Sequence, residues 1–472
     1  MAFDSLEFIA FIGLFFGLWP FVREHNTPRW LFMAATSILF YAWGSYQYVW
    51  VLLTTGYIDY RAALAMEKYP EHKKRLLWIS LAANLGMLGV FKYLDFFIGN
   101  LNTLTALAGL DPLPLLKLEL PIGISFYTFE SMSYTIDVYR GRFKATNNVI
   151  KFYAFLSLWP RLAAGPIVRA GQFIPQLDQY NPVTPMRWWN GTRLIAYGFF
   201  KKLVIADQVA GAVDTAFRAA TINQSAAYWW VVMMLFSVQI YGDFSGYSDI
   251  ARGLGKWMGV DFPLNFRHPF LSFSVTKVWT RWHISLVNWF RDYLYYPIIG
   301  RDYRSKLRGN LAMTTVLVCS GFWHGAMWSF IIWGLWHSLF TWIERDTRYP
   351  ERLLKLRGGR HVATAITLAL FLLSNVFFRV GPDVSRAFLI VGRMLTPTFS
   401  NFFDVIREHQ YESLAIAFVL GRHAWFYFTM PKGVLAWRRR FRYYTEPLEL
   451  GILFAAVVFL RGPGHQFIYF QF

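Results

Sequence analysis

The sequence predicts an all-α polytopic membrane protein, and three observations support this fold class. Only 16% of the 472 residues are charged, whereas a soluble chain carries roughly a quarter. The mean hydropathy is positive, at +0.31, although the formal net charge is +19. The two values are compatible if basic residues gather in short loops between apolar helices, as they do on the cytoplasmic side of membrane proteins.

Apolar stretches recur along the whole chain, and about 20 helical residues suffice to cross a hydrocarbon core of about 30 Å. We expect roughly 10–12 transmembrane and re-entrant helices on this length criterion. The candidate stretches are 7–22, 30–58, 76–99, 121–137, 150–168, 192–213, 227–242, 311–343, 362–378, 384–396, 411–429 and 448–460. Several are short or interrupted by Pro and Gly, and interrupted helices at membrane depth indicate a buried cavity. No repeat or long linker divides the chain, so we expect one membrane domain, 1–472.

Basic loops indicate the orientation of these helices. The loops expected on the cytoplasmic side are 61–75, 301–308, 345–360 and 438–442. Because the basic clusters flank apolar runs, they favour a membrane protein over a nucleic-acid-binding protein. The N-terminal MAFDSLEF lacks the basic region of a cleavable signal peptide, so we expect the first helix to be retained.

The apolar run 311–343 lies between two of these basic loops. A single crossing would place one loop outside, and the run is too long for one upright helix. We therefore expect a pair of shortened helices that enters the membrane and returns, with Gly321 and Gly325 near its first third. By the same logic, the stretch 30–58 is expected to break at residues 43–45.

Few side chains are suited to catalysis, and His324 is the first candidate. It stands in a run without any charged residue from Leu311 to Ile343, where an ionisable group is costly and usually faces a cavity. The structural alternative is a buried histidine that donates to a backbone carbonyl. The flanking glycines favour the functional reading because they allow close approach of backbone or ligand.

His283 is the second candidate, in the polar and aromatic segment around Arg281 and Asp292. A structural hydrogen-bonding role is the alternative. On a continuous helix, His337 would lie about 140° around and roughly 20 Å along the axis from His324, so we expect a structural role for it. Asp243 and Asp249 follow an apolar span and could orient a histidine, cap a helix start or serve structure. His268 could line the edge of a site.

Other chemistries find little support. The single cysteine, Cys319, excludes an intramolecular disulfide and a cysteine-based zinc site. There is no HExxH motif, no GxSxG elbow and no P-loop, so we expect no metal and no bound cofactor. A neutral imidazole in a buried cavity can take a proton from an attacking hydroxyl and return it to a leaving group. Acyl transfer from a thioester to an alcohol needs little more than this and positioned donors for the oxyanion.

Five segments resemble the membrane-bound O-acyltransferase superfamily, most of all its bacterial alginate O-acetyltransferase branch, as does the terminal FIYFQF. They are PIGISFYTFESMSYTIDVYRG (121–141), AAGPIVR (163–169), DFSGYSDIARGLGKWMGVDFPLNF (243–266), TRWHISLVNWFRDYLYYPI (280–298) and GFWHGAMWSFIIWG (321–334). They occur in family order. Two positions depart from the family pattern: Arg161 lies before AGPI, and Gly242 stands where relatives often carry a bulky residue.

The resemblance implies a ring of tilted helices around a central tunnel in the bacterial inner membrane. It implies that His324, in the WHG motif, and His283, in the RWHIS motif, are the catalytic pair. The residues expected to line the tunnel are Trp323, Arg281, Trp282, Asp243, Asp249 and His268. The acyl donor implied for the acetylating branch is acetyl-CoA, which enters from the cytoplasm.

The activity implied is O-acetylation of an extracytoplasmic polysaccharide that is alginate-like, cellulose-like or a peptidoglycan. D-alanyl transfer to teichoic acid is the alternative within the family, and a non-catalytic transporter is the alternative from another class. No loop of the chain is long enough for an independent domain of about 50 residues. We therefore expect a secreted or membrane-tethered partner transferase to complete polymer acetylation.

Overall fold

The computed structural model describes residues 1–472 apart from 2, 220–221, 301–304, 429–439 and 468–472. The described residues are helical and contain no β-strand. They form two compact units, residues 1–195 with 251–263 and residues 196–250 with 264–472. Parts of the basic loops 301–308 and 438–442, and most of the FIYFQF motif, lie outside the described residues. The all-α prediction is confirmed for the part of the chain that is described.

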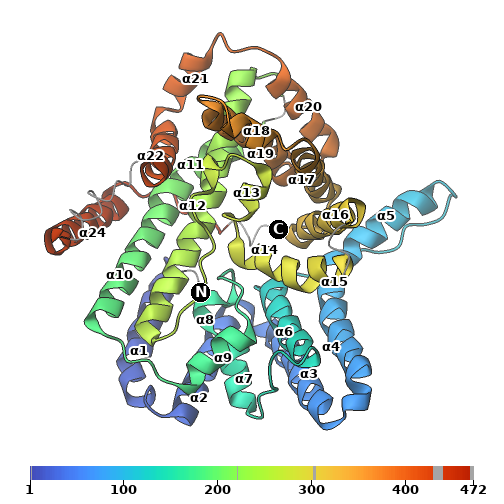
Figure 1. Cartoon of the computed structure of the whole chain (residues 1–472), viewed down its shortest axis with the longest axis vertical. Helices are drawn as coiled ribbons and strands as arrows, with labels where there is room; N and C mark the ends of the chain where they lie inside the picture. The colour runs from blue at the N-terminus through green and yellow to red at the C-terminus, as the bar shows by residue number, and fades with distance from the viewer. Residues whose placement is uncertain (2, 220–221, 301–304, 429–439, 468–472) are drawn as a thin grey trace. The chain divides into compact units, whose positions relative to one another are not determined.

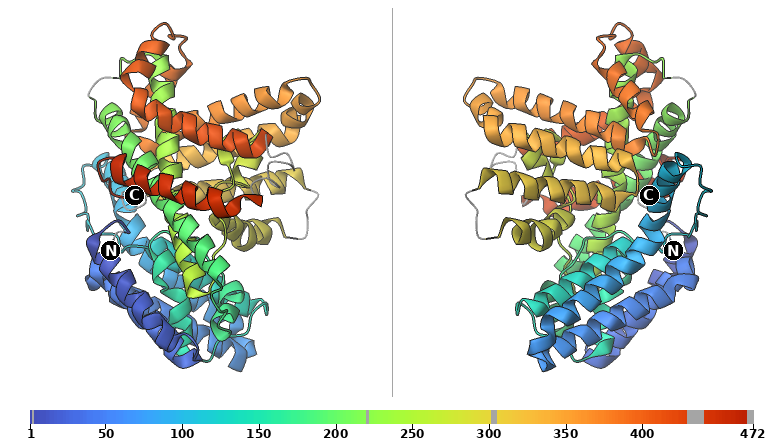
Figure 2. Two further views of the ribbon diagram at one scale, coloured as in Figure 1. Left: turned by 90° about the vertical axis from the view of Figure 1, so that its left-hand side faces the viewer. Right: turned by 90° about the vertical axis from the view of Figure 1, so that its right-hand side faces the viewer.

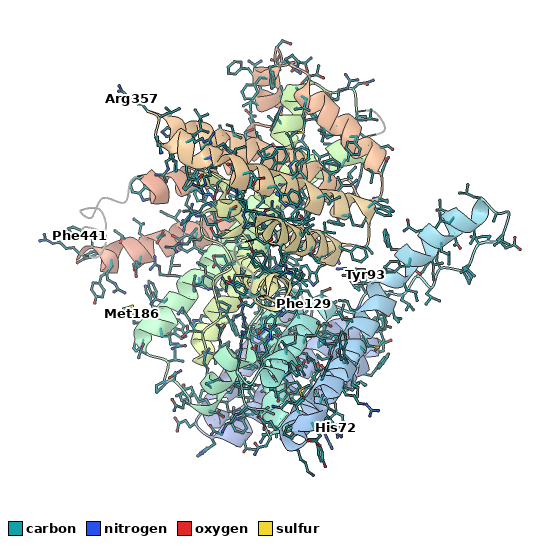
Figure 3. The ribbon with its side chains drawn as sticks, turned by 45° about the vertical axis from the view of Figure 1, so that its right-hand side comes forward. His72, Tyr93, Phe129, Met186, Arg357 and Phe441 are labelled. Atoms are coloured by element: carbon teal, nitrogen blue, oxygen red, sulfur yellow. The ribbon has the colours of Figure 1, made fainter. Side chains whose placement is uncertain are left out.

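The first unit consists of helices that follow the predicted spans closely in most places. They are α1 (Leu6–Val22), α2 (Asn26–Ser45), α3 (Val49–Lys68), α4 (Lys73–Leu88), α5 (Leu94–Ala106), α6 (Ile124–Tyr139), α7 (Val149–Leu156), α8 (Trp159–Leu162), α9 (Ala170–Asp178) and most of α10 (Pro185–Phe199). The predicted break at 43–45 is confirmed, because α2 ends at Ser45 and a 3₁₀ turn precedes α3. The π-helical turn η3 (Gly89–Tyr93) joins α4 to α5. Figure 3 labels Tyr93 at this turn and His72 just before the start of α4.

The stretch 150–168 is not one span, as the sequence analysis predicted, but two short helices. α7 ends at Leu156 and α8 starts at Trp159, with Pro160 in its first turn. Proline lacks the amide that an unbroken helix would need at this point. Arg161, the departure from the family pattern, lies in α8, where it is buried and forms an ion pair with Glu130 of α6. Arg161 thus joins α6 and α8 within the first unit.

A carboxylate at the centre of the first unit holds three helices together. Asp59 of α3 is fully buried and accepts hydrogen bonds from Ser80 at 2.6 Å and Asn84 at 2.7 Å, both on α4. Ser131 of α6 donates to the same carboxylate. Polar groups with their hydrogen bonds satisfied in this way fix helix register inside an apolar bundle.

The second unit contains the predicted catalytic segments. Its helices are α11 (Asp207–Arg218), α12 (Ala226–Met258, up to Ile250), α13 (Val275–Trp279), α14 (Ile284–Phe290), α15 (Tyr296–Ile299), α16 (Lys306–His324), α17 (Trp328–Thr347), α18 (Tyr349–Leu354), α19 (Gly359–Arg379), α20 (Val384–Leu395), α21 (Phe402–Glu408), α22 (Gln410–Phe428) and α24 (Arg442–Phe459). Figure 1 labels them, and Figure 2 shows α16, α17 and α19 as neighbouring rods. Serine side chains cap α13 and α16 at their N-termini, which satisfies amides that helices leave unpaired.

The run 311–343 forms two antiparallel helices, as predicted, but neither is shortened. α16 has 19 residues and α17 has 20, because both extend into the polar flanks of the run. Hydrogen bonds join them at the open end, from Arg345 to Asn310 at 3.0 Å, and midway, between Thr314 and Ser338 at 2.6 Å. The hairpin therefore places its two basic flanks at the same end.

Glycines allow the close packing of this hairpin. A Cβ on Gly321 would lie 2.1 Å from the carbonyl oxygen of Phe330, and one on Gly334 would lie 2.5 Å from that of Leu317. The glycines therefore admit a neighbouring backbone, as expected, and such small residues are typical of close helix pairs in membranes.

α17 is polar inside and apolar outside, as expected of a helix in lipid. Its buried face includes His337, Ser338, Thr341 and Glu344. Its exposed face carries Trp328, Leu335, Leu339 and Ile343. Soluble helices show the opposite arrangement.

Two of the described helical stretches are long and apolar enough to cross a membrane by length and composition. They are Pro70–Ala106, with 37 residues, and Gly359–Arg379, with 21 residues. The number of 10–12 spanning and re-entrant helices therefore stays a prediction. α12 contains the polar residues Gln239, Asp243 and Asp249.

Candidate active site

His324 ends α16 at the turn of the hairpin. Gly325 follows in an extended conformation, and α17 begins three residues later at Trp328. The imidazole is 6% exposed and packs against Trp323 and Phe378, each with ring centroids 5.0 Å apart. The aromatic contacts hold the ring in a buried position where the helix ends.

His283 is held in an unusual backbone conformation. It stands just before α14 with φ 45° and ψ 50°, a left-handed region that non-glycine residues rarely occupy and that is enriched at functional sites. Asn265 fixes the turn through two hydrogen bonds. Its backbone carbonyl oxygen accepts a hydrogen bond from the Ile284 amide at 2.9 Å, and its side-chain oxygen accepts one from the Ser285 amide at 3.2 Å. Asn265 in turn donates to Ser248 of α12 at 3.1 Å. The surroundings therefore determine the direction of the His283 side chain.

Both histidines line one small cavity, with a volume of about 20 Å³. Its other polar walls include Ser320 of α16 and Asn375 of α19, and Asn375 donates to Ser237 of α12 at 2.8 Å. The remaining lining residues are apolar or aromatic. Burial lowers the pKa of His283 to about 3, so its imidazole is neutral at pH 7. The cavity thus combines a neutral imidazole with walls that are mostly apolar or aromatic.

Two of the residues predicted to line the tunnel lie at this cavity. Trp282 is one of its walls. Trp323 contacts both imidazoles, with ring centroids 6.1 Å from His283 and 5.0 Å from His324. The structure therefore brings together four of the predicted residues: the two histidines and the two tryptophans that precede them in the sequence.

Asp243 and Asp249 are not among the residues that line this cavity, and neither caps a helix. Both lie inside α12, which continues to Met258, well beyond the predicted end at 242. Asp243 pairs with Lys202 at 2.9 Å, and Asp249 pairs with Lys201 at 2.6 Å. The capping interpretation is wrong because the polar run after residue 242 stays helical, its carboxylates being neutralised by lysines.

His268 and Arg281 are not among the residues that line this cavity. The ring of His268 packs against His423 of α22 with centroids 5.1 Å apart. Burial, together with the positive charges of Arg422, Lys201, Arg281 and Arg267, lowers the pKa of His268 to about 4. The backbone carbonyl of Arg281 accepts from the Arg267 amide at 2.9 Å. These residues belong to a cationic region of the second unit.

Sequence reasoning judged one polar residue near the site, His337, on a premise that fails and missed two others. The break at Gly325 removes the premise of a continuous helix, and His337 lies with its ring 4.8 Å from that of Trp333, a wall of the cavity. Its Nε2 atom has no hydrogen-bond partner among the residues that the structure describes. The two missed residues are Asn265 and Asn375. An asparagine within an apolar helix was a usable signal for Asn375, whereas the role of Asn265 depends on a turn that only the structure shows.

The arrangement suits a metal-free reaction in which an imidazole takes a proton from a hydroxyl oxygen and gives it to a leaving sulphur or oxygen atom. Among the described residues, no three His, Cys, Asp or Glu side chains are grouped so that they could hold a metal ion. A buried neutral imidazole beside a mostly apolar cavity can act as a general base. The prediction of metal-free catalysis stays a prediction that chelation can test.

Comparison with known proteins identifies relatives over most of the chain. The model of the membrane-bound O-acyltransferase family matches residues 21–370. A probable alginate O-acetylase of Azotobacter vinelandii is 39% identical over 369 residues, which are 76% of this chain and 72% of the relative. A peptidoglycan O-acetyltransferase of Helicobacter pylori is 32% identical over 401 residues, covering 79% and 74%.

A more distant relative has a different acyl group in its name. A teichoic acid D-alanyltransferase of Streptococcus thermophilus is 28% identical over 233 residues, 46% of this chain and 55% of the relative. The family match and the two acetyltransferases agree with the resemblance carried by the WHG and RWHIS motifs. The chain belongs to the membrane-bound O-acyltransferase family and is an O-acyltransferase.

Proposed function

We propose that this enzyme takes an acetyl group from acetyl-CoA on the cytoplasmic side and passes it across the inner membrane for O-acetylation of an extracytoplasmic polysaccharide. The observation that carries the proposal is the shared cavity of His283 and His324. The acetyl donor is favoured because the acetyltransferase relatives align over about three quarters of the chain, whereas the D-alanyltransferase aligns over 46%. Family membership favours catalysis over the transporter alternative.

His324 acts as the general base in this proposal. Its imidazole takes the proton from the acceptor hydroxyl while the oxygen attacks the thioester carbonyl, so that a C–O bond forms and the C–S bond breaks. The leaving thiolate receives the proton back from the imidazolium. His283, neutral because burial lowers its pKa to about 3, donates to the developing oxyanion from the opposite wall, an interaction that is strong where water is excluded.

The enzyme works as one membrane domain in which tilted helices surround a central tunnel. The cavity, the α16–α17 hairpin of two full-length helices and the polar residues on the inner face of α17 support this architecture. An acetyl group crosses such a tunnel more easily than a hydrated polymer enters it, because polar groups lose their water there. A separate secreted or membrane-tethered transferase therefore receives the acetyl group at the outer mouth and completes polymer acetylation.

Reconstitution tests the proposal. The purified chain is placed in liposomes with acetyl-CoA inside. Alginate, cellulose or peptidoglycan is added outside. We expect neither sustained CoA release nor polymer acetylation from the chain alone, because the partner supplies the acceptor; both should appear after the partner transferase is added, and a chelator should have no effect. Efficient polymer acetylation by the chain alone refutes the relay, and absence of CoA release with an active partner refutes the acetyl-CoA donor.

A further inference from the structure

Two further small cavities lie next to the catalytic cavity in the second unit. One lies between the 3₁₀ turn η5 (Pro269–Leu271), α13 and α19. The other lies between α13, α17 and α19, which Figure 1 labels side by side. Each has a volume of about 10 Å³, which is about the room of one water-sized group. We call these two the outer cavities, and the catalytic assignment leaves them without a role.

Phe371 of α19 separates the catalytic cavity from the outer cavities. It lines all three of them, and no other residue does so among the described residues in their walls. The side chain is 6% exposed. Its ring centroid lies 5.3 Å from that of Trp282, a wall of the catalytic cavity, and 6.2 Å from that of His337, a wall of an outer cavity. The phenyl ring is therefore a partition between these spaces.

The catalytic cavity has room for a very short acyl group. Its volume is about 20 Å³, the room of about two water-sized groups. An acetyl group presents two such groups beyond its carbonyl carbon, the methyl group and the carbonyl oxygen. Each further methylene of a longer acyl group needs about as much room again. A propionyl or butyryl group would therefore meet the walls of the cavity.

Phe371 can limit this room without holding the catalytic histidines. Its ring contacts are with Phe270, Trp282 and His337, and they include neither His283 nor His324. Asn375, one turn further along α19, donates to Ser237 of α12 at 2.8 Å. This hydrogen bond fixes the part of the helix that carries the phenyl ring.

Removal of the phenyl ring would join the three cavities. The two outer cavities together offer roughly as much room as the catalytic cavity itself, and the volume of the lost ring adds to it. Most of the added wall is apolar or aromatic, with Val275, Val278, Phe340 and Leu370 among its residues. An alkyl chain longer than a methyl group would fit against such a wall.

We infer that Phe371 limits the transferred acyl group to two carbons and is thus a specificity-determining residue. The inference rests on the proposed function, because it takes the catalytic cavity to hold the acyl group of the donor. The methyl group of the acetyl chain lies towards the phenyl ring, and a longer chain is refused because the ring occupies the space that its added methylenes need.

The first measurement compares the affinities of the purified full chain for S-ethyl-CoA and S-butyl-CoA. These thioethers carry two-carbon and four-carbon chains, cannot transfer an acyl group and need no partner transferase. Phe371→Ala is compared with Phe377→Ala, which removes the same ring from a buried position of the same helix that is not in the walls of the three cavities. Phe371→Leu is the milder variant if Phe371→Ala does not fold, and melting temperatures check folding.

The second measurement does not depend on which thioester is the donor. Cells that carry each variant are supplied with propionate and butyrate, and the acids esterified to their polysaccharide are released by mild alkali and quantified. The partner transferase is the same for every variant, so a change in the acids reports a change in the membrane chain.

We expect the unmutated chain and Phe377→Ala to bind S-ethyl-CoA about ten-fold more tightly than S-butyl-CoA, since a misfitting methylene alters selectivity by about ten-fold or more. Phe371→Ala should lose this preference and place longer esters on the polymer, with Phe371→Leu intermediate. Adding Val278→Leu to Phe371→Ala should restore the preference for the short chain, because Val278 lines both outer cavities.

The inference is overturned if Phe371→Ala and Phe371→Leu keep the chain-length preference of the unmutated chain in both measurements. It is also overturned if Phe377→Ala changes that preference as much as Phe371→Ala does. Longer esters in Phe371→Ala cells, together with no thioether binding by any variant, would support the length limit and reject only acetyl-CoA as the donor. A changed thioether preference without longer esters would support the limit in this chain and place a second limit in the partner.

Discussion

The indole of Trp323 contacts the imidazoles of both His283 and His324, although the two histidines come from different segments of the chain. His324 is fixed by the end of α16, and His283 by a left-handed turn before α14. Since both rings also line one cavity, a substrate carbonyl placed there would face both. Each histidine can be tested separately because their backbone requirements differ.

We expect His324→Ala to lower the acetylation rate by about 10²–10⁴-fold, the usual contribution of a general base. The substitution removes a buried ring at the end of α16, so the amount of protein in the membrane must be measured alongside activity. His361→Ala, at an exposed position in the first turn of α19, is the matched control. Unchanged acetylation by well-expressed His324→Ala protein would remove His324 from the mechanism.

Two substitutions separate the chemical role of His283 from its backbone conformation. Glycine accepts a positive φ without strain, whereas alanine does not, and φ is 45° here. We expect His283→Gly and His283→Ala to lose activity to a similar extent, while the melting temperature of His283→Gly is higher than that of His283→Ala, because only glycine removes the strain of the left-handed backbone. High activity of His283→Gly would leave His283 with a positioning role in the turn.

The sequence predicted the helical class and the hairpin because each depends on local pattern, and local motifs also singled out the two histidines, whose catalytic role stays a prediction. The end of α16 at the WHG motif is one example, because Gly325 follows His324 directly and ends the helix. What could not be predicted depends on contacts between distant segments. The lysine partners of Asp243 and Asp249 come from a π turn about forty residues earlier in the chain, and no local pattern near the two carboxylates identifies those partners.

Close packing of the α16–α17 hairpin predicts a steric effect at Gly321. Gly321→Ala would place a Cβ 2.1 Å from the Phe330 carbonyl oxygen, and such overpacking costs about 1–3 kcal/mol. We expect a lower melting temperature of the purified protein and, because His324 ends the same helix, reduced activity. Gly392→Ala on α20, where a Cβ meets nothing within 4 Å, should be neutral. Equal melting temperatures for both variants would contradict the packing.

The buried charges around Lys202 predict that removing one member of the cluster lowers the stability of the fold strongly. Lys202 pairs with Asp207 at 2.7 Å and Asp243 at 2.9 Å, and both carboxylates are at most 3% exposed. Loss of one partner from a buried ion cluster costs about 3–5 kcal/mol, so Lys202→Met should unfold at a clearly lower temperature.

Two further variants check this explanation. In the Lys202→Met protein, the added substitutions Asp207→Asn and Asp243→Asn remove the two unpaired carboxylates and should recover part of the lost stability. Lys256→Met, which breaks an exposed pair with Asp261, should cost about 0–1 kcal/mol. A Lys202→Met protein as stable as the Lys256→Met protein would show that the cluster does not stabilise the fold.

The hairpin also makes a prediction about membrane topology. Because α16 and α17 are antiparallel and bonded at their open end by Arg345 and Asn310, Lys306 and Arg352 should face the same side. The positive charges of these flanks place that side in the cytoplasm. In a Cys319→Ser background, single cysteines at Lys306 and Arg352 should resist an impermeant thiol reagent in intact cells and react after permeabilisation. A cysteine at Lys73, in the basic loop 61–75, should behave in the same way. Labelling of only one hairpin position from outside would mean that the chain crosses the membrane once between them, which two bonded antiparallel helices cannot do.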